Sequence, residues 1–185
     1  MINIYEIGDY YINKARELCH PSFTILKTDC FNEVHLKSIL PHIRCNSLHC
    51  IETSAMRVAK SKRMYNANYV IGSITDMPYA DKKFDLILDF STMDHVADYK
   101  KAIAEYERTL ADDGLVYIIV WLDCLNFSPG TMKHNALPRW DFIKELKKKF
   151  NIIHHRTILR RAFRKNISFV EFKLIKNIPE NVDLK

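Results

Sequence analysis

Acidic and polar side chains follow several apolar segments of this chain, where they could bind a ligand or handle a proton. Glu52 comes directly after the apolar run Leu48–Ile51. Asp94 and His95 come shortly after the run Phe84–Phe90. A carboxylate offers two acceptor oxygens, and a histidine can exchange a proton near neutral pH. If the runs are parallel strands, these side chains lie at the edge of a sheet where ligands bind in open α/β folds.

Two other kinds of chemistry have weaker support. Four potential metal ligands lie close together, at His42, Cys45, His49 and Cys50. Their order matches no common zinc pattern, and adjacent residues of a strand point to opposite faces. No G-x-S-x-G segment surrounds a serine, as the nucleophile elbow of a hydrolase requires. The sequence therefore predicts no metal site and no serine hydrolase.

The elements that must position these residues follow from the apolar pattern. The predicted strands are Phe23–Leu26, Leu48–Ile51, Tyr69–Ile71, Phe84–Phe90, Leu115–Trp121, Asn151–Leu159 and Ile167–Ile175. The predicted helices are Asp9–Cys19, Asn32–Ile43, Ala55–Met64, Asp98–Leu110 and Pro138–Phe150. Apolar strands that alternate with helices indicate an α/β fold with a doubly wound, mostly parallel sheet, here of seven strands. The closely connected last two strands indicate an antiparallel strand at its C-terminal end.

Local signals add detail to two of these elements. Ser54 is a good N-cap for the helix Ala55–Met64, in which Met56 and Ala59 should face the core. The segment 112–114, Asp-Asp-Gly, predicts a turn before the strand Leu115–Trp121.

We interpret the chain as a single domain over residues 1–185, because no linker or repeat separates two cores. Residues 1–21 would form an N-terminal cap helix, and residues 22–121 a ligand-binding core. Residues 122–137 lack periodicity and predict a long loop, which is often functional. Residues 138–176 would form a helix and a terminal β-hairpin.

Composition and charge restrict the function classes. Hydrophobic residues make up 48% and charged residues 27%, as in globular proteins, and no apolar run is long enough to span a membrane. We therefore expect a cytoplasmic protein, with its five cysteines reduced. The net charge of +6 gathers near the C-terminus, where an anionic or nucleic-acid ligand could bind. A basic surface that only faces solvent would give the same pattern.

The most distinctive stretch runs from Gly72 to Trp121. It reads GSITDMPYADKKFD at 72–85, MDHVAD at 93–98 and AEYERTL at 104–110. These segments and their spacing resemble the class I S-adenosylmethionine-dependent methyltransferases of the small-molecule type, over roughly residues 23–121. The resemblance implies the Rossmann-like methyltransferase fold, S-adenosylmethionine as cofactor, and methyl transfer to a small-molecule acceptor.

The resemblance also assigns cofactor-binding residues. They are Thr28, Asp29, Glu52, Thr53, Ser73, Ile74, Asp89, Phe90 and Ser91. Glu52 falls at the acid that accepts hydrogen bonds from both ribose hydroxyls, Ser73 and Ile74 fall beside the adenine, and Asp89 to Ser91 line the methionine half. By itself, Glu52 could equally be an ordinary acid at the start of a helix.

The loop that would face the acceptor carries the predicted catalytic residues Asp94 and His95. A general base is needed only if the acceptor holds its proton at neutral pH, and Asp94, His95 or His134 could then serve. The short N-terminal segment provides only a small lid, so a partner subunit of a homodimer could complete the site.

The first loop departs from the family pattern. The family has an acid and three glycines there, whereas here Lys27 replaces the acid. The glycine positions hold Asp29, Phe31 and Glu33, although glycine permits positive φ and close approach of a ligand. Lys27 would repel the ammonium group of the cofactor, and Asp29 or Glu33 could take over that group. Two hypotheses remain: a methyltransferase with a reshaped loop, or an inactive methyltransferase-like domain that binds a partner.

Overall fold

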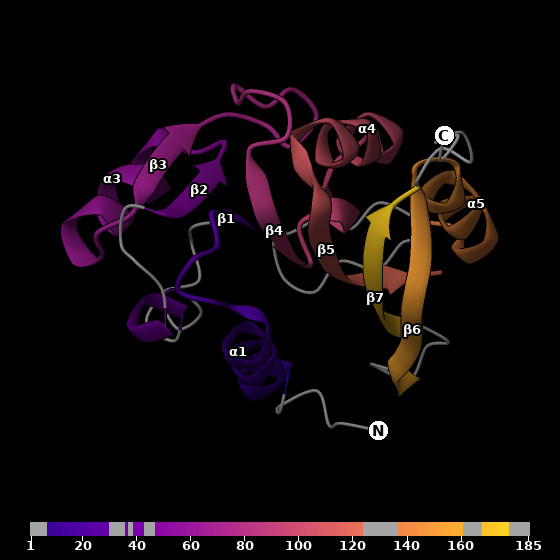
Figure 1. Cartoon of the computed structure of the whole chain (residues 1–185). Coiled ribbons are helices and arrows are strands. Elements are labelled where there is room, and N and C mark those ends of the chain that lie inside the picture. The colour runs from indigo at the N-terminus through magenta and orange to yellow at the C-terminus, as the bar shows by residue number, and fades with distance from the viewer. Residues whose placement is uncertain are drawn as a thin grey trace.

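The sheet has seven strands in the order β3-β2-β1-β4-β5-β7-β6 (Figure 1). The computed structural model describes residues 7–29, 36, 39–42, 47–123, 137–160 and 168–177. The strands are β1 (Ile25–Thr28), β2 (Leu48–Glu52), β3 (Asn68–Ile71), β4 (Phe84–Phe90), β5 (Leu110–Leu122), β6 (Phe150–Arg160) and β7 (Ser168–Lys176). The strands β1 to β5 pair in parallel, and β7 is antiparallel to both β5 and β6. The predicted doubly wound sheet with an antiparallel C-terminal strand is confirmed.

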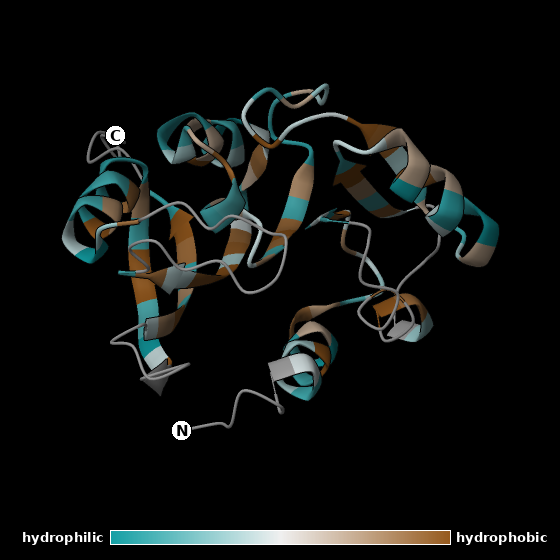
Figure 2. Ribbon diagram, turned by 180° about the vertical axis from the view of Figure 1, so that it is seen from behind, coloured by the Kyte–Doolittle hydropathy of each residue, from teal (hydrophilic) through white to brown (hydrophobic). Residues whose placement is uncertain are grey.

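Helices cover both faces of the sheet. They are α1 (Ile7–Leu18), α3 (Ala55–Met64), α4 (Tyr99–Thr109) and α5 (Arg139–Lys149), with the short 3-10 turns η2 (Leu40–His42) and η4 (Met93–His95). Two hydrophobic cores result, one under α1 and α3 and the other under α4 and α5. In Figure 2 hydrophobic residues run along the central strands, while the helices carry much hydrophilic surface. None of the helices within the described residues is long and apolar enough to cross a membrane.

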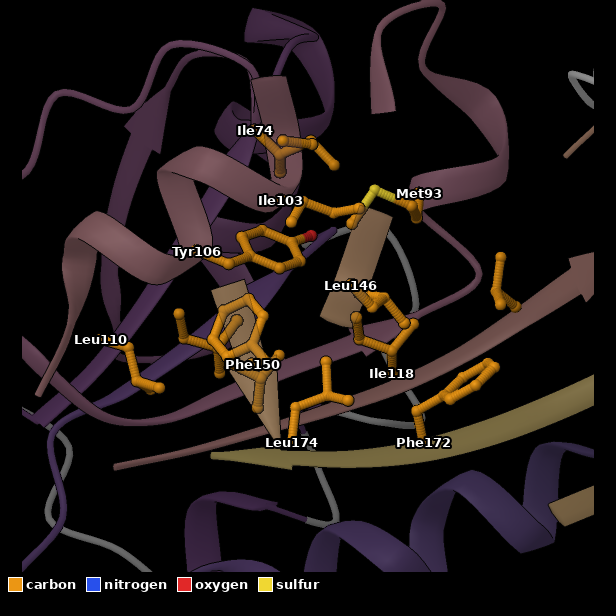
Figure 3. Close-up of a cluster of buried hydrophobic side chains, with 14 of the residues drawn as sticks. Ile74, Met93, Ile103, Tyr106, Leu110, Ile118, Leu146, Phe150, Phe172 and Leu174 are labelled. Atoms are coloured by element: carbon orange, nitrogen blue, oxygen red, sulfur yellow. The ribbon is translucent and has the colours of Figure 1, made fainter. Parts of the chain in front are cut away.

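The core beneath α4 and α5 joins helices and strands that lie far apart in the sequence (Figure 3). Ile103 and Tyr106 of α4 and Leu146 of α5 lie above the sheet. Ile118 of β5 and Phe172 of β7 meet them from the sheet itself. This packing fixes α4 against the carboxyl half of β4, where a ligand would bind.

Strand β1 differs from its prediction. It begins at Ile25 and ends at Thr28, so Lys27 and Thr28 belong to the strand and not to the following loop. Both side chains are completely buried. Buried lysines are rare, and the predicted strand accordingly ended at Leu26, before Lys27. Here the Lys27 ammonium lies 5.2 Å from the centre of the Phe90 ring and donates to the Thr28 carbonyl.

Two other local predictions were wrong. In α3 the buried residues are Val58 and Ser61, whereas Met56 and Ala59 are exposed. The small Ser61 faces the sheet, where its carbonyl accepts a hydrogen bond from the Tyr69 hydroxyl. The segment 111–114 is a bulge within β5, since Phe84 pairs with Leu110 and Leu86 already pairs with Leu115. The predicted helix over 32–43 lies largely outside the described residues, as do residues 124–136 of the predicted loop.

His49 in β2 links stability to pH. Its ring contacts the rings of Tyr79 and Phe84, with centroids 5.6 and 5.5 Å away. Burial, assisted by the charge of Lys83, lowers the pKa of His49 to about 4. In the unfolded chain this pKa is about 6.5, so protons bind the unfolded state more tightly. The stabilisation is complete above the unfolded pKa and declines as the pH falls toward the folded pKa.

We predict that His49→Gln reduces the acid sensitivity of the fold, because glutamine does not titrate. Thermal unfolding, followed by circular dichroism at pH 7 and pH 4.5, should show a smaller loss of melting temperature for this variant than for the wild type. His20→Gln, which changes an exposed histidine, serves as the matched control and should behave like the wild type. Equal losses in His49→Gln and wild type would contradict the prediction.

Candidate functional site

A cavity of about 360 Å³ lies at the carboxyl ends of β1 to β4. Strand β1 sits between β2 and β4, so the strand order reverses there, and such a reversal is the usual ligand site of this sheet class. Six of the predicted cofactor-binding residues line the cavity, namely Asp29, Glu52, Thr53, Ser73, Ile74 and Ser91. His95 lines it as well. The sheet thus brings together residues that are up to 66 positions apart in the sequence.

Glu52 ends β2 and is almost completely buried in the cavity wall. Its Oε1 atom accepts hydrogen bonds from the Ser54 backbone N–H at 2.9 Å and the Thr53 hydroxyl at 3.2 Å. Its Oε2 atom lies 3.7 Å from the Arg57 guanidinium. The carboxylate therefore does precede a helix N-terminus, as one interpretation of the sequence held, and it also borders the cavity.

Arg57 is a cavity residue that the sequence analysis missed. It lies in the first turn of α3, where the predicted inward face was placed on Met56 and Ala59. The sequence did offer one signal for Arg57, since a cationic side chain so soon after the Glu52 carboxylate could pair with it. The guanidinium compensates part of the Glu52 charge at this end of the cavity.

The segment after β3 carries Ser73 and Ile74 and is held by Arg108 of α4. The Arg108 guanidinium donates to the carbonyls of Tyr79 at 2.7 Å and Met77 at 3.0 Å. It also pairs with the Glu105 carboxylate, which accepts a hydrogen bond from the Met77 N–H at 2.6 Å. A planar guanidinium suits several fixed acceptors at once. Ile74 is buried in the core on one side and reaches the cavity on the other.

Left-handed backbone occurs at two residues of the wall. Asp29 follows β1 with a φ of 95°, and Ser91 follows β4 with a φ of 60°. Their N–H groups are fixed, because Asp29 donates to the Ile51 carbonyl at 3.1 Å and Ser91 to the Ile119 carbonyl at 2.7 Å. Residues other than glycine seldom adopt such angles, and those that do are concentrated at functional sites.

Thr28 and Asp89, which were predicted to bind the cofactor, lie behind the wall and support it. The Asp89 carboxylate accepts hydrogen bonds from the Tyr106 hydroxyl at 2.6 Å and the Thr92 N–H at 2.7 Å. Thr28 donates to the Thr92 hydroxyl at 2.9 Å. Burial raises the pKa of Asp89, and the Tyr106 hydrogen bond opposes that shift. Both residues therefore fix Thr92, which does line the cavity.

Phe90 likewise stands outside the cavity wall, on the face covered by α1. Its ring stacks on the Tyr11 ring, with centroids 4.9 Å apart. The Tyr11 hydroxyl shares a hydrogen bond of 2.8 Å with the Ser91 hydroxyl. The N-terminal helix thus reaches a residue of the wall.

A second contact fastens α1 to the C-terminal strands. The buried Glu171 carboxylate of β7 accepts hydrogen bonds from Tyr10 of α1 and Tyr117 of β5. Arg156 of β6 donates to the same carboxylate at 2.9 Å. Burial alone would raise the pKa of Glu171, but the hydrogen bonds from Tyr10, Tyr117 and His154 outweigh it and hold this pKa below its usual value.

The two predicted catalytic residues take different positions in η4. His95 lines the cavity and is partly exposed, whereas the Asp94 side chain is fully buried behind it. The His95 Nε2 atom lies 3.9 Å from the Asp94 carboxylate. This distance exceeds that of a hydrogen bond.

Tyr106→Phe tests how far the wall depends on the Asp89 carboxylate. Loss of the hydroxyl leaves a buried carboxylate with one donor fewer, which should cost about 1–3 kcal/mol of unfolding free energy. Urea unfolding measures this cost. Tyr99→Phe, on the same helix, keeps the ring that contacts Phe142 and should change it much less. Equal stability of the two variants would show that Asp89 does not need this donor.

Sequence comparisons find similarity to methyltransferases. Residues 35–118 match a family model described as a methyltransferase domain. The chain is 30% identical over 77 residues to the chloroplastic tocopherol O-methyltransferase of Arabidopsis thaliana, covering 42% of this chain and 21% of that protein. It is 30% identical over 101 residues to the putative methyltransferase YrhH of Bacillus subtilis (strain 168), covering 52% of this chain and 56% of that protein. The matches thus span about a fifth of the tocopherol O-methyltransferase and little more than half of YrhH.

Solved structures share the fold at low sequence identity. The [4+2]-cyclase SpnF has a TM-score of 0.76 at 12% identity, over 92% of this chain and 82% of its own. The N-methyltransferase NodS of Bradyrhizobium japonicum WM9, in complex with S-adenosyl-L-homocysteine, has a TM-score of 0.68 at 15% identity. This likeness covers 92% of this chain and 86% of the NodS chain. Together with the sheet order and the antiparallel last strand, these likenesses show that the chain has the Rossmann-like methyltransferase fold, and residues 35–118 are similar to a methyltransferase domain.

Proposed function

We propose that this protein is an S-adenosylmethionine-dependent methyltransferase that acts on a small-molecule acceptor. The observation that carries the proposal is the cavity at the reversal of strand order, with Glu52 at the end of β2 and His95 after β4 in its wall. The shared fold alone does not decide the reaction, since a [4+2]-cyclase has it as well. The support therefore comes from the residues of the cavity.

Those residues fit the methyl donor. A vicinal diol such as that of ribose suits the Glu52 carboxylate, whose Oε2 atom is the one that does not hold the helix N-terminus. Ile74 offers an apolar surface for the adenine, and the Ser73 hydroxyl a polar one. The cavity volume of about 360 Å³ lies within the range of about 300–1,000 Å³ typical of small-ligand sites.

The segment after β1 opposes binding of S-adenosylmethionine less than the sequence indicated. Lys27, which was expected to repel the ammonium group, is not among the residues that line the cavity. Its own ammonium is directed to the Phe90 ring and the Thr28 carbonyl. Phe31 and Glu33 lie outside the described residues.

S-adenosylmethionine, when bound, supplies a methyl group open to nucleophilic attack. The chain itself would hold the two reactants in line and exclude water, and most of the rate would come from this positioning. His95 lines the cavity, where it would remove a proton from an acceptor hydroxyl or amine, and the buried Asp94 carboxylate lies 3.9 Å from its Nε2 atom. An acceptor that is already deprotonated would not need this step.

A small-molecule acceptor is favoured over nucleic acid because part of the basic charge is engaged within the fold. Arg156 binds Glu171, Lys148 pairs with Glu145, and Lys149 lies 3.6 Å from Glu107. Ion pairs of this kind reduce the positive field available to a phosphate backbone.

Calorimetric titration with S-adenosylhomocysteine tests donor binding. We expect binding to the wild type, and about 10- to 100-fold weaker binding to Glu52→Gln, which keeps the acceptor for Ser54 but loses the charge. Glu107→Gln, an acid of α4 away from the cavity, is the control and should bind normally. Absence of both heat and a shift in melting temperature with the wild type at millimolar ligand would refute the proposal and favour a domain that binds a different partner.

Methyl transfer itself can be followed with S-adenosylmethionine labelled on its methyl group, incubated with fractionated small-molecule extracts. We expect label in a low-molecular-weight product. For an acceptor that must lose a proton, His95→Asn should lower the transfer rate by about 10²–10⁴-fold, the usual contribution of a general base, and leave S-adenosylhomocysteine affinity nearly unchanged. Unaltered transfer by the variant would remove His95 from the mechanism.

A further inference from the structure

One end of the sheet, formed by α3 and β3, carries charge of a single sign (Figure 1). Both elements belong to the segment 53–75, which contains Arg57, Lys60, Lys62 and Arg63 and no aspartate or glutamate. Basic residues in the last turn of a helix stabilise its dipole, which accounts for Lys62 and Arg63 in part. It does not account for the lack of acids, which leaves the whole segment attractive to an anionic partner.

The outer face of α3 combines these cations with an exposed methionine. Val58 and Ser61 are the buried residues of this helix and mark its inner face. Met56, Lys60 and Arg63 follow one another at helical spacing on the opposite side, and all three are exposed. The Met56 side chain retains 80% of its accessible surface. It therefore contributes little to the packing of the chain and is available for contact with a partner.

Exposed hydrophobic side chains are concentrated at this end of the sheet. Among the described residues five large hydrophobic side chains are exposed, and three of them, Met56, Met64 and Ile71, belong to α3 or β3. Ile71 points to the side of the sheet that α3 covers, because Tyr69, two residues earlier, donates a hydrogen bond to the Ser61 carbonyl of α3. We define the α3 surface as Met56, Lys60, Lys62, Arg63, Met64 and Ile71.

A second cavity adjoins the α3 surface. Its volume is about 410 Å³, and Lys62, Arg63, Met64 and Tyr65 are among the residues that line it. Lys62 and Arg63 are exposed, and they form no ion pair with any other described residue. Two cations beside a cavity can bind an anionic group such as a phosphate. This cavity shares no lining residue with the candidate functional site.

We propose that the α3 surface binds a lipid bilayer whose headgroups are anionic. Lys60, Lys62 and Arg63 attract the headgroups, and a phosphate of one lipid occupies the cavity beside Lys62 and Arg63. Met56 and Met64 enter the boundary between headgroups and acyl chains. The proposal is independent of the proposed function, since none of these residues lines the candidate functional site.

The apolar part of the α3 surface favours a bilayer over nucleic acid. Cations alone would suit a phosphate backbone. Proteins that bind single strands also offer aromatic side chains on which the bases stack. The large exposed apolar side chains of α3 are methionines instead, and Tyr69 is buried. The boundary of a bilayer accepts methyl groups and cations side by side.

Co-sedimentation with lipid vesicles tests the proposal and needs no enzymatic activity. The wild type is mixed with vesicles of phosphatidylcholine, or of phosphatidylcholine with about one third phosphatidylserine. We expect binding to the anionic vesicles, at least about tenfold weaker binding to phosphatidylcholine, and a loss of binding as the salt concentration rises.

Two double variants separate the charged and the apolar contributions. Lys62→Gln with Arg63→Gln should lower the affinity for anionic vesicles about 30-fold, at about fivefold for each cation. Met56→Ser with Met64→Ser should lower it about fivefold and leave its salt dependence unchanged, because only apolar contact is lost. Both pairs of side chains are exposed, so the melting temperatures should stay close to that of the wild type.

Lys144→Gln with Lys147→Gln is the matched control, since it removes the same charge from exposed positions of α5. It should bind anionic vesicles as the wild type does. A wild type that binds neither kind of vesicle would overturn the proposal. An equal loss of affinity in this control and in the Lys62, Arg63 variant would overturn it as well, because net charge alone would then explain the binding.

Two further probes distinguish the bilayer from other anions. Glycerol 3-phosphate, titrated by calorimetry, should bind only at millimolar concentration or above, because it lacks the acyl chains and the neighbouring headgroups. Tight binding of this compound through Lys62 and Arg63, without vesicle binding, would assign the cavity to a free phosphate and overturn the proposal. Binding of a fluorescent RNA oligonucleotide through the same two residues, again without vesicle binding, would overturn it in favour of nucleic acid.

Discussion

The candidate site depends on one buried carboxylate, that of Asp89. Removing a carboxylate from water is costly unless donors surround it, and here the Tyr106 hydroxyl and the Thr92 N–H supply them at 2.6 and 2.7 Å. Because these donors come from α4 and from the turn after β4, a single side chain sets the relation between strand, turn and helix. The positions of Thr92 and His95 in the cavity wall follow from that relation. Asp89 thus determines the positions of cavity residues although it does not line the cavity itself.

A second constraint is the way in which the strands end. Among the described residues, four other than glycine have positive φ, and three of them directly follow β1, β4 and β5, namely Asp29, Ser91 and Asp123. These strands are neighbours in the sheet. Left-handed residues turn the chain sharply away from the strand direction, so that the backbone leaves the sheet edge and a cavity can form above it. Unfavourable backbone conformations are therefore concentrated where a ligand would bind.

Much of the fold was predictable, and the reasons are local. Strands β4, β5 and β7 have apolar runs or a clear alternation, and Pro138 correctly indicated the start of α5. The errors arise where a tertiary contact outweighs local preference. Lys27 continues β1 because the Phe90 ring covers its ammonium, and α3 presents Ser61 to the sheet where hydrophobicity favoured Met56. For the same reason the family resemblance could place Glu52, Ser73 and His95 near one cavity, but it could not show that Arg57 joins them or that Asp89 lies behind the wall.

The contacts of α1 have a consequence for the order in which the protein can be assembled during synthesis. Tyr10 needs Glu171, and Glu171 lies in the last strand of the sheet, 161 residues later. Helix α1 therefore has no complete docking surface until the 161 residues that separate Tyr10 from Glu171 have been made. A nascent chain that lacks β7 also lacks the partner of Tyr10, so α1, which carries the Tyr11 contact to Ser91 of the cavity wall, would be held less firmly.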